Sequence, residues 1–479
     1  MKLFNTYKYQ KHKEMRTIMK NNNFFRTVCN LAIPVALQSM LQSSFSIIDQ
    51  IMIGQLGSVN VAGVGLAGKF SSIFSVIASA IGAIAGIMIS QYLGQKNKPE
   101  VRRSFYLNLS LGTLIAGFFT FICLLFPKQI MGMYTTDFET CQTAALYLIL
   151  ISSTFIPIAV TTLISTLLRC MEKTQIPLYA SIVAAVLNTG LNYILIFGKL
   201  GFSPMGAQGA AIATVISQYA NLIFMAAFMF KNRAILQNTE KSKSILCCFN
   251  WKQYISMLLP ILVCEVAWSL GENVYASIYG HIGTDACAAM TLINPVQGLM
   301  IGALCGLSQA ASIIVGKKLG NEEYDDAYKA SKKLILYGVA GSLILSVIVI
   351  ISSTFYVEIY NVEENVKLLT KQILFAYALV APFKVLNMIL GGGIIRSGGK
   401  TKYVMFIDII GTWGFGVPLG FVSAFIFNFS IPYVYFILSL EECIRFIISL
   451  FVFRDKKWMN CLEAPNSDSK SMELSKKAV

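Results

Sequence analysis

Long apolar segments separated by short polar loops dominate the chain. A helix needs about 20 predominantly apolar residues to cross a bilayer. We count twelve segments of at least that length, and several exceed it, which indicates tilted or broken helices. They cover approximately residues 25–53, 59–90, 105–126, 141–168, 176–198, 206–230, 253–280, 286–316, 334–355, 366–395, 403–428 and 431–453. The pattern predicts an all-α integral membrane protein with twelve transmembrane helices.

The composition agrees with a membrane protein. Of the 479 residues, 55% are hydrophobic and 13% are charged, whereas soluble domains contain about 25% charged residues. The first 23 residues are polar and basic without a short apolar core, so we predict no signal peptide. The cysteines have no metal-ligand spacing, and we predict no cofactor. The polar tail from about residue 459 is predicted to be disordered.

The distribution of charge predicts an orientation. A net charge of +15 suits a nucleic-acid partner, but Lys and Arg lie mainly in the N-terminal arm, the tail and alternate loops. The positive-inside rule therefore places both termini in the cytoplasm, as an even number of spans requires. We predict a multi-pass protein of the bacterial inner membrane. Its expected partners are the lipid bilayer and small organic cationic substrates, with no nucleic acid, and we expect a monomer.

The two halves of the chain match each other in four places, in order, at an offset of 226 or 227 positions. The matches are Pro34 with Pro260, "QLGSVNVAGVGLA" (55–67) with "HIGTDACAAMTLI" (281–293), "QYLGQKN" (91–97) with "KKLGNEE" (317–323), and "RCMEKT" (169–174) with "RSGGKT" (396–401). Six spans return the chain to its starting side, so both halves insert with the same topology. We predict two six-helix lobes related by a pseudo-twofold axis along the membrane normal.

This duplication divides the chain into five parts. They are an N-terminal arm (1–24), an N-lobe (25–230), a linker (231–251), a C-lobe (252–453) and a tail (454–479). The prolines at 34 and 260 are expected to bend the first helix of each lobe. Two lobes suit alternating access, in which one lobe rocks against the other, although a static scaffold is the alternative.

Polar side chains inside the N-lobe spans are candidates for function. A charge at mid-bilayer costs about 2.5–3.5 kcal/mol on insertion scales, so it normally faces a cavity or a partner. Asp49 shares a helical face with Gln38 and is a candidate cation ligand. The alternatives are that it caps the following loop or pairs with Lys69. Asn188 and Asn192, one turn apart, offer amide oxygens to a cation or hydrogen bonds between helices.

The C-lobe has its own candidates. Glu265 follows Pro260 by five residues and precedes Trp268 by about one turn. The proline frees a carbonyl and the indole offers a π face to an organic cation. Glu265 is therefore a candidate proton carrier or cation ligand, the alternative being a neutral acid bonded to a neighbouring helix. Glu272, two turns further, shares this role or solvates the vestibule.

Lys384 and three residues of the last span complete the set. Lys384 lies near the middle of the tenth span, where it either neutralises Glu265 or competes with cations for it. Glu441, Glu442 and Arg445 have the spacing of ion pairs within one helix, and we interpret them as structural.

The chain resembles the multidrug and toxic compound extrusion (MATE) family of cation-coupled antiporters, in the MOP flippase superfamily. The resemblance covers residues 25–458. It rests on "LAIPVALQSMLQSSFSIIDQIMIGQLG", "VAGVGLAG", "ISQYLGQKN", "LLRCMEKTQIPLYASIVAAVLNTGLNYILIFG", "LPILVCEVAWSLGENVYASIYGHIG", "GGGIIRSGGKTKY" and "EECIRFIISLFVFRDKKW". It implies export of organic cations and multiple drugs by alternating access, driven by entry of H⁺ or Na⁺.

The resemblance also implies roles for N-lobe residues. Asp49 matches the first-helix acid implicated in proton or sodium coupling, and is the residue that would bind Na⁺. Asn188 matches its fifth-helix partner, and Asn192 occupies a position where some members carry Asp. Thr214 matches a nearby sixth-helix hydroxyl.

In the C-lobe, the chain departs from the family pattern. Glu265 matches a seventh-helix acid tied to cation binding in one branch. That branch also carries a tenth-helix Asp, where this chain has Lys384 and Asn387 instead. The resemblance therefore does not decide whether the coupling ion is H⁺ or Na⁺.

Other classes of function fit less well. A flippase for a lipid-linked saccharide, the alternative within this superfamily, would use a wide basic cavity, whereas the candidates here are mostly acids and amides. An intramembrane enzyme would need a catalytic pair or a metal motif, and the sequence has neither HExxH nor GxGD, so we predict no enzyme. In the favoured mechanism a carboxylate binds either the coupling ion or the organic cation, never both.

Overall fold

The computed structural model describes residues 2–231, 250–360 and 362–462, and within these residues it contains helices and no strands. Most helices of the first half follow the predicted spans, because each is a long apolar segment that satisfies its own backbone hydrogen bonds. They are α1 (Lys2–Gly54), α2 (Ser58–Gly94), α3 (Lys98–Leu125), α4 (Pro127–Gly132), α5 (Phe138–Ser152), α6 (Phe155–Cys170), α7 (Gln175–Phe197) and α8 (Gly206–Lys231).

The second half is also a succession of membrane helices, and it includes three π-helical segments, η2 to η4. Its elements are α9 (Trp251–Ile282), α10 (Thr284–Gly320), α11 (Tyr324–Glu358), α12 (Glu364–Asn387), η2 (Met388–Ile395), α13 (Thr401–Ile409), η3 (Ile410–Gly416), α14 (Val417–Phe421), η4 (Val422–Ile426), α15 (Ile431–Ser439) and α16 (Glu441–Asp455). Four of these, α13 to η4, together form one membrane-length helix, Thr401–Ile426. The all-α membrane class is confirmed.

Two of the twelve predicted spans differ from single straight helices. By length and composition, ten helices of the described residues are able to cross a membrane, or eleven when α5 and α6 count as one span bent by 44°. The predicted span 431–453 is divided at Leu440 into α15 and α16, which have 9 and 15 residues. The first turn of α16 contains two acids, and these lower its apolar character.

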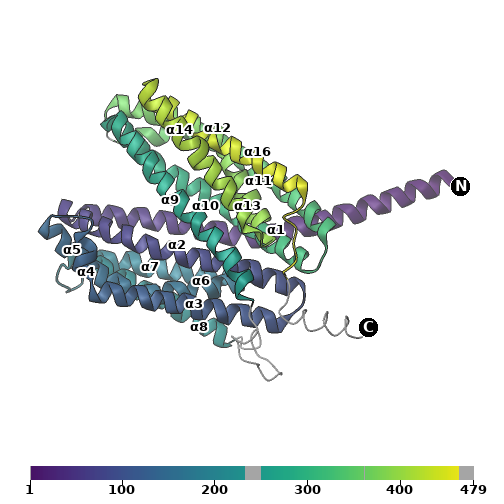
Figure 1. The fold of residues 1–479 in the computed structure, drawn as a ribbon, viewed down its shortest axis with the longest axis horizontal. Coiled ribbons are helices and arrows are strands. Elements are labelled where there is room, and N and C mark those ends of the chain that lie inside the picture. Colours follow the sequence, from purple (N-terminus) through teal and green to yellow (C-terminus); the bar gives the residue numbers. More distant parts are fainter. Residues whose placement is uncertain (1, 232–249, 361, 463–479) are drawn as a thin grey trace.

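The helices form two bundles (Figure 1). The bundle of α1 to α8 and the bundle of α9 to α16 lie apart at the end that carries α5 and α14, and they converge at the other end. The buried apolar residues follow the same division. One cluster, which includes Leu31, Leu304 and Leu462, draws on both bundles, whereas two further clusters belong to one bundle each. We call the region of the shared cluster the closed end.

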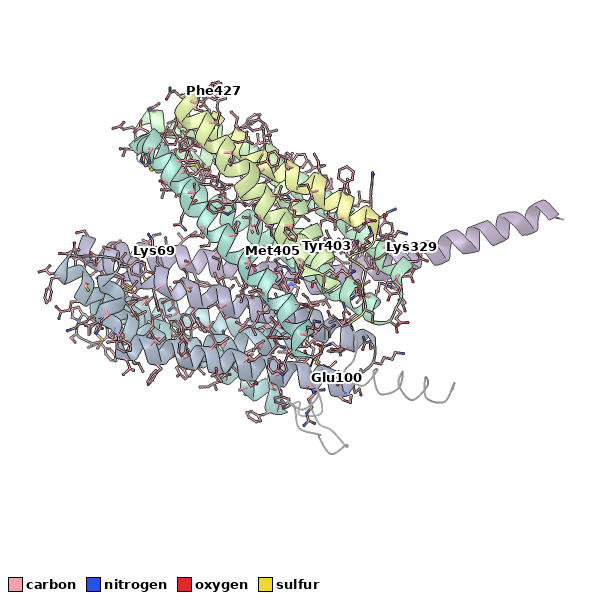
Figure 2. All side chains as sticks on the ribbon, in the orientation of Figure 1. Lys69, Glu100, Lys329, Tyr403, Met405 and Phe427 are labelled. Carbon is pink, nitrogen blue, oxygen red and sulfur yellow. The ribbon has the colours of Figure 1, made fainter. Side chains whose placement is uncertain are left out.

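The closed end is the one that the sequence predicts to be cytoplasmic. Lys329 and Glu100 lie there, whereas Phe427 lies at the far end of the C-lobe (Figure 2). The first helix of each lobe also contacts the other lobe at this end. Phe25 of α1 packs edge-on against Tyr337 of α11, with ring centroids 5.4 Å apart. In return, the Tyr254 hydroxyl of α9 donates a hydrogen bond to Asn108 of α3 at 2.9 Å.

The two copies of one repeated sequence meet at the closed end. A Cβ atom at Gly94 of α2 would overlap the carbonyl oxygen of Lys317 in α10, and a Cβ atom at Gly320 of α10 would overlap that of Gln91 in α2. These glycines are 226 positions apart and belong to the matched stretches 91–97 and 317–323. The contact therefore obeys the predicted pseudo-twofold symmetry. Small residues permit such close backbone approach between membrane helices.

The chain termini depart from expectation. The predicted N-terminal arm is part of α1, which begins at Lys2. The helix continues through Pro34 without interruption. The prediction of a disordered tail from about residue 459 is wrong for residues 459–462, which lie between the lobes, and residues 463–479 lie outside the described part. The predicted linker 231–251 also falls mostly outside it.

Gly320→Ala should destabilise the protein, because its methyl group would overlap the Gln91 carbonyl and force the two helices apart. Overpacking of this kind costs about 1–3 kcal/mol, which a thermal unfolding scan in detergent would detect as a lower midpoint. Gly117→Ala is the matched control, because no atom lies within 4 Å of the added Cβ. Equal unfolding midpoints for the two variants would contradict the close contact.

Candidate ion and substrate sites in the two lobes

A hydrogen-bonded polar cluster links three helices of the N-lobe. The Asn192 amide of α7 donates to the Asp49 carboxylate of α1 and lies 3.3 Å from the Asn188 side-chain oxygen. The Asn188 amide in turn lies 3.3 Å from the Thr214 hydroxyl of α8, which donates to the Ala210 carbonyl at 3.0 Å. All four site residues that the sequence predicts in this lobe therefore lie together.

Local sequence explains why the cluster forms. Asn188 and Asn192 are one helical turn apart, so both side chains lie on the same face of α7. The neighbouring helix α8 approaches α7 closely at Gly209, where a Cβ atom would lie 2.8 Å from the carbonyl oxygen of Leu195 in α7. This approach brings Thr214 within reach of Asn188.

One acceptor in the cluster lacks a partner. The Asn192 side chain is 1% exposed, and its oxygen has no hydrogen bond from any described residue. An unsatisfied buried acceptor costs about 1–3 kcal/mol. A hard cation bound in the cluster would satisfy this oxygen, since carboxylate and carbonyl oxygens are the ligands such cations prefer, whereas a proton would neutralise the Asp49 carboxylate. The residues present fit either coupling ion.

The alternative roles of Asp49 find no support in its contacts. Among the described ion pairs none includes Asp49, and Lys69 is exposed. The hydrogen bond that Asp49 does accept comes from a helix 143 residues away. It therefore connects two helices and does not cap a loop.

The C-lobe contains a partly open cavity of about 310 Å³ between α9, α10, α12, α15 and α16. Eight of its eighteen lining residues are aromatic or charged. The aromatic residues are Tyr275, Tyr279, Tyr377 and Tyr435, and the charged residues are Glu272, Lys384, Glu441 and Glu442. Of the C-lobe residues predicted from the sequence to bind a cation or substrate, only Glu272 and Lys384 line it.

Arg445 pairs with three carboxylates at one wall of the cavity, of which Glu441 and Glu442 line the cavity and Asp408 does not. Its guanidinium nitrogens lie 3.5 Å from Glu441, 3.8 Å from Asp408 and 4.0 Å from Glu442, and it also donates to Thr412. The predicted pairing within the last span is thus confirmed. Because three acids share one cation, this wall carries an excess of negative charge when the acids are ionised.

Neighbouring polar groups fix the two glutamates. The Tyr275 hydroxyl donates to Glu441 at 2.5 Å, and the Asn387 amide donates to Glu442 at 2.8 Å. Gly416 of η3 allows this packing, because a Cβ atom there would overlap the Glu441 carboxylate. We did not expect from the sequence that Glu441 and Glu442 line a cavity. The sequence pattern that could have indicated this is two adjacent acids with only one arginine nearby, which leaves one acid without a partner in its own helix.

Glu265 has a partner that we did not predict from the sequence. Its carboxylate lies 3.7 Å from the Arg396 guanidinium. The hypothesis that Lys384 neutralises Glu265 is therefore wrong, because Arg396, at the end of η2, occupies that place. Neither Glu265 nor Trp268, which is 47% exposed, lines the C-lobe cavity.

The two lobes distribute their polar groups differently. At the repeat offset of 226, Tyr275 occupies the position of Asp49. The first helix of the N-lobe thus supplies an acid, whereas that of the C-lobe supplies a hydroxyl to an acid on α16. Neither lobe is a copy of the other in its chemistry.

Comparisons with known proteins agree with this architecture. A family model described as MatE matches residues 34–194 and 260–422, and both stretches begin at the repeat-related prolines. The chain is 20% identical over 435 residues to the uncharacterized transporter YisQ of Bacillus subtilis, covering 90% of this chain and 94% of that protein. It is 22% identical over 436 residues to the probable multidrug resistance protein NorM of Thermotoga maritima, covering 90% and 93%.

A solved structure supports the fold. A point mutant of the Vibrio cholerae MATE transporter VcmN aligns with a TM-score of 0.83 at 16% identity, covering 91% of this chain and 99% of that one. The family model matches more than half of the chain, in one stretch of each lobe. The protein therefore belongs to the MATE family of membrane transporters.

Proposed function

We propose that this protein exports organic cations, drugs among them, across the bacterial inner membrane in exchange for H⁺ or Na⁺. The observation that carries the proposal is the hydrogen-bonded cluster of Asp49, Asn188 and Asn192, in which the Asn192 oxygen has no hydrogen bond from any described residue. A relative named as a probable multidrug resistance protein supports drug efflux. We do not propose a lipid-linked saccharide flippase, because neither the acidic C-lobe cavity nor these relatives favour it.

The coupling ion binds at Asp49 with Asn188, Asn192 and Thr214. An ionised carboxylate in an apolar bundle attracts a cation, and a bound ion removes that charge. The membrane potential and the ion gradient both favour inward movement of the ion and so give the cycle its direction.

The organic cation binds in the C-lobe cavity. Its volume of about 310 Å³ is at the lower end of the range for small-molecule sites, which is about 300–1,000 Å³. Its carboxylates attract a cation, and its four tyrosines offer π faces. Lys384 reduces the excess of negative charge in the cavity, so the affinity for a cation is low enough to permit its release.

The exchange follows if ion binding in the N-lobe and cation binding in the C-lobe favour opposite orientations of the two lobes. When the closed end is cytoplasmic, as the basic loops predict, the structure represents a conformation accessible from outside. An ion entering from outside neutralises Asp49, and the organic cation leaves the C-lobe cavity outward before the lobes reorient. The lobes then rock, and the ion is released inward.

Asp49→Asn should lower gradient-driven efflux of a cationic dye at least tenfold, because an amide does not take up a proton and carries no negative charge to hold a cation. Proteoliposomes with a pH gradient and a sodium gradient imposed separately would measure the rate and identify the coupling ion. Asp285→Asn is the matched control, since Asp285 lies in the first turn of α10 at the far end and its side chain contacts Asn365. Undiminished efflux by Asp49→Asn would remove Asp49 from the coupling site.

Glu272→Gln should weaken binding of tetraphenylphosphonium about tenfold, equal to about 1.4 kcal/mol, because the cavity loses an exposed carboxylate that has no described ion-pair partner. Titration calorimetry on the purified protein would measure the affinity. Glu265→Gln tests the residue that the sequence favoured. A larger loss of affinity for Glu265→Gln than for Glu272→Gln would place the cation beside Arg396 and outside the cavity.

A further inference from the structure

Residues 458–462 follow α16 and run through the seam between the lobes at the closed end. We infer that this segment is a latch, which holds the closed end shut and must leave α2 each time the lobes reorient. The inference rests on the proposed transport cycle, since a protein whose lobes never separate needs no releasable contact.

The segment is anchored in the C-lobe. The Trp458 side chain is fully buried, and its indole NH donates to the Phe453 carbonyl at 3.1 Å. Gly398 packs against the Trp458 backbone so closely that a Cβ atom would overlap the Trp458 carbonyl oxygen. At the other end of the segment, Leu462 is 3% exposed and lies against Gly399.

From this anchor the segment reaches the N-lobe at Gln91. The Gln91 amide of α2 donates to the Ser397 carbonyl at 2.7 Å and to the Asn460 carbonyl at 3.2 Å, and its oxygen accepts from the Leu462 NH at 2.7 Å. Gln91 is fully buried. One N-lobe side chain thus binds three main-chain groups of the C-lobe and its tail.

A second glutamine, one turn along from Gln91 at the end of α2, extends the contact. The Gln95 amide donates to the Leu462 carbonyl at 2.8 Å and lies 3.2 Å from the Cys461 sulfur. That sulfur lies 3.7 Å from the carbonyl of Gly320, the last residue of α10. The segment therefore covers the point where α2 and α10 meet.

The contact is not part of the repeat. At the offset of 226, Lys317 and Asn321 occupy the positions of Gln91 and Gln95. Lys317 forms an ion pair with Glu172 at 2.6 Å, and Asn321 donates to Glu323. The glutamines thus serve a contact that duplication of the lobes does not require.

The hydrogen bonds suit a contact that breaks repeatedly. The groups in this contact are neutral, so they can form hydrogen bonds with water when the contact opens. Separating a buried ion pair would cost far more free energy, because it would leave an unpaired charge. The latch adds stability to the closed end and does not prevent its opening.

Gln95→Cys places a second thiol beside the native Cys461, and ethanediyl bismethanethiosulfonate can join the two reversibly. In proteoliposomes the joined protein should lose efflux at least tenfold, and dithiothreitol should restore it. Gln95→Cys combined with Cys461→Ser, treated in the same way, should keep its rate and so controls for the other thiols. An unchanged rate in protein whose crosslink is complete by mass spectrometry would overturn the latch, while the untreated variant's efflux reports on the proposed function separately.

A readout independent of transport is hydrogen exchange in the purified full chain. Gln91→Glu keeps the size of the side chain but removes the amide donor and sets a charge against two carbonyls. Backbone amides of residues 458–462 should then exchange at least tenfold faster than in the unchanged protein. Gln55→Glu is the control, because Gln55 is an exposed residue just beyond α1 at the far end, and exchange of residues 458–462 should not change in that variant. Unchanged exchange in Gln91→Glu would refute the latch whatever the transport result.

Discussion

Close backbone contact between α2 and α10 determines how the lobes relate to each other. Gly94 and Gly320 each face a carbonyl of the opposite helix with no room for a side chain. Lipid tails are as apolar as leucine, so helices in a membrane associate through such packing and polar contacts more than through burial of apolar surface. The shared apolar cluster and the ion pair between Lys317 and Glu172 gather at the same end. The lobes are thereby joined at one end and separate at the other.

The two lobes use the same frame for different chemistry. In the N-lobe the Asp49 carboxylate accepts a hydrogen bond from an amide, and no described ion pair includes it. In the C-lobe three carboxylates share Arg445, and two of them line a cavity that four tyrosines also line. A lone acid responds to a small ion, whereas a larger charged cavity accommodates a bulkier cation. This difference is the physical reason for our proposal that the coupling ion and the exported molecule bind in different lobes.

Sequence reasoning succeeded where information was local or repeated. Span positions follow from apolar length, and the Asn188 and Asn192 face follows from helical spacing. The partner of Glu265 could not be predicted, because Arg396 is 131 residues away and no sequence spacing relates the two residues. The order of residues 459–462 was missed for a similar reason, since it depends on Gln91, a residue of another lobe. Contacts between distant helices leave no periodic trace in one sequence.

The contacts that the first helix of each lobe makes with the other lobe bear on how such a protein arose. Neither half buries the closed-end part of its own first helix alone, since α1 packs against the second half and α9 against the first. A single-half ancestor could make these contacts, and the glycine contact, only with another copy of itself. The same surface would then be used twice about a twofold axis, as in an isologous interface. The present chain is in this sense a fused parallel homodimer, whose fusion freed each half to change its charges independently.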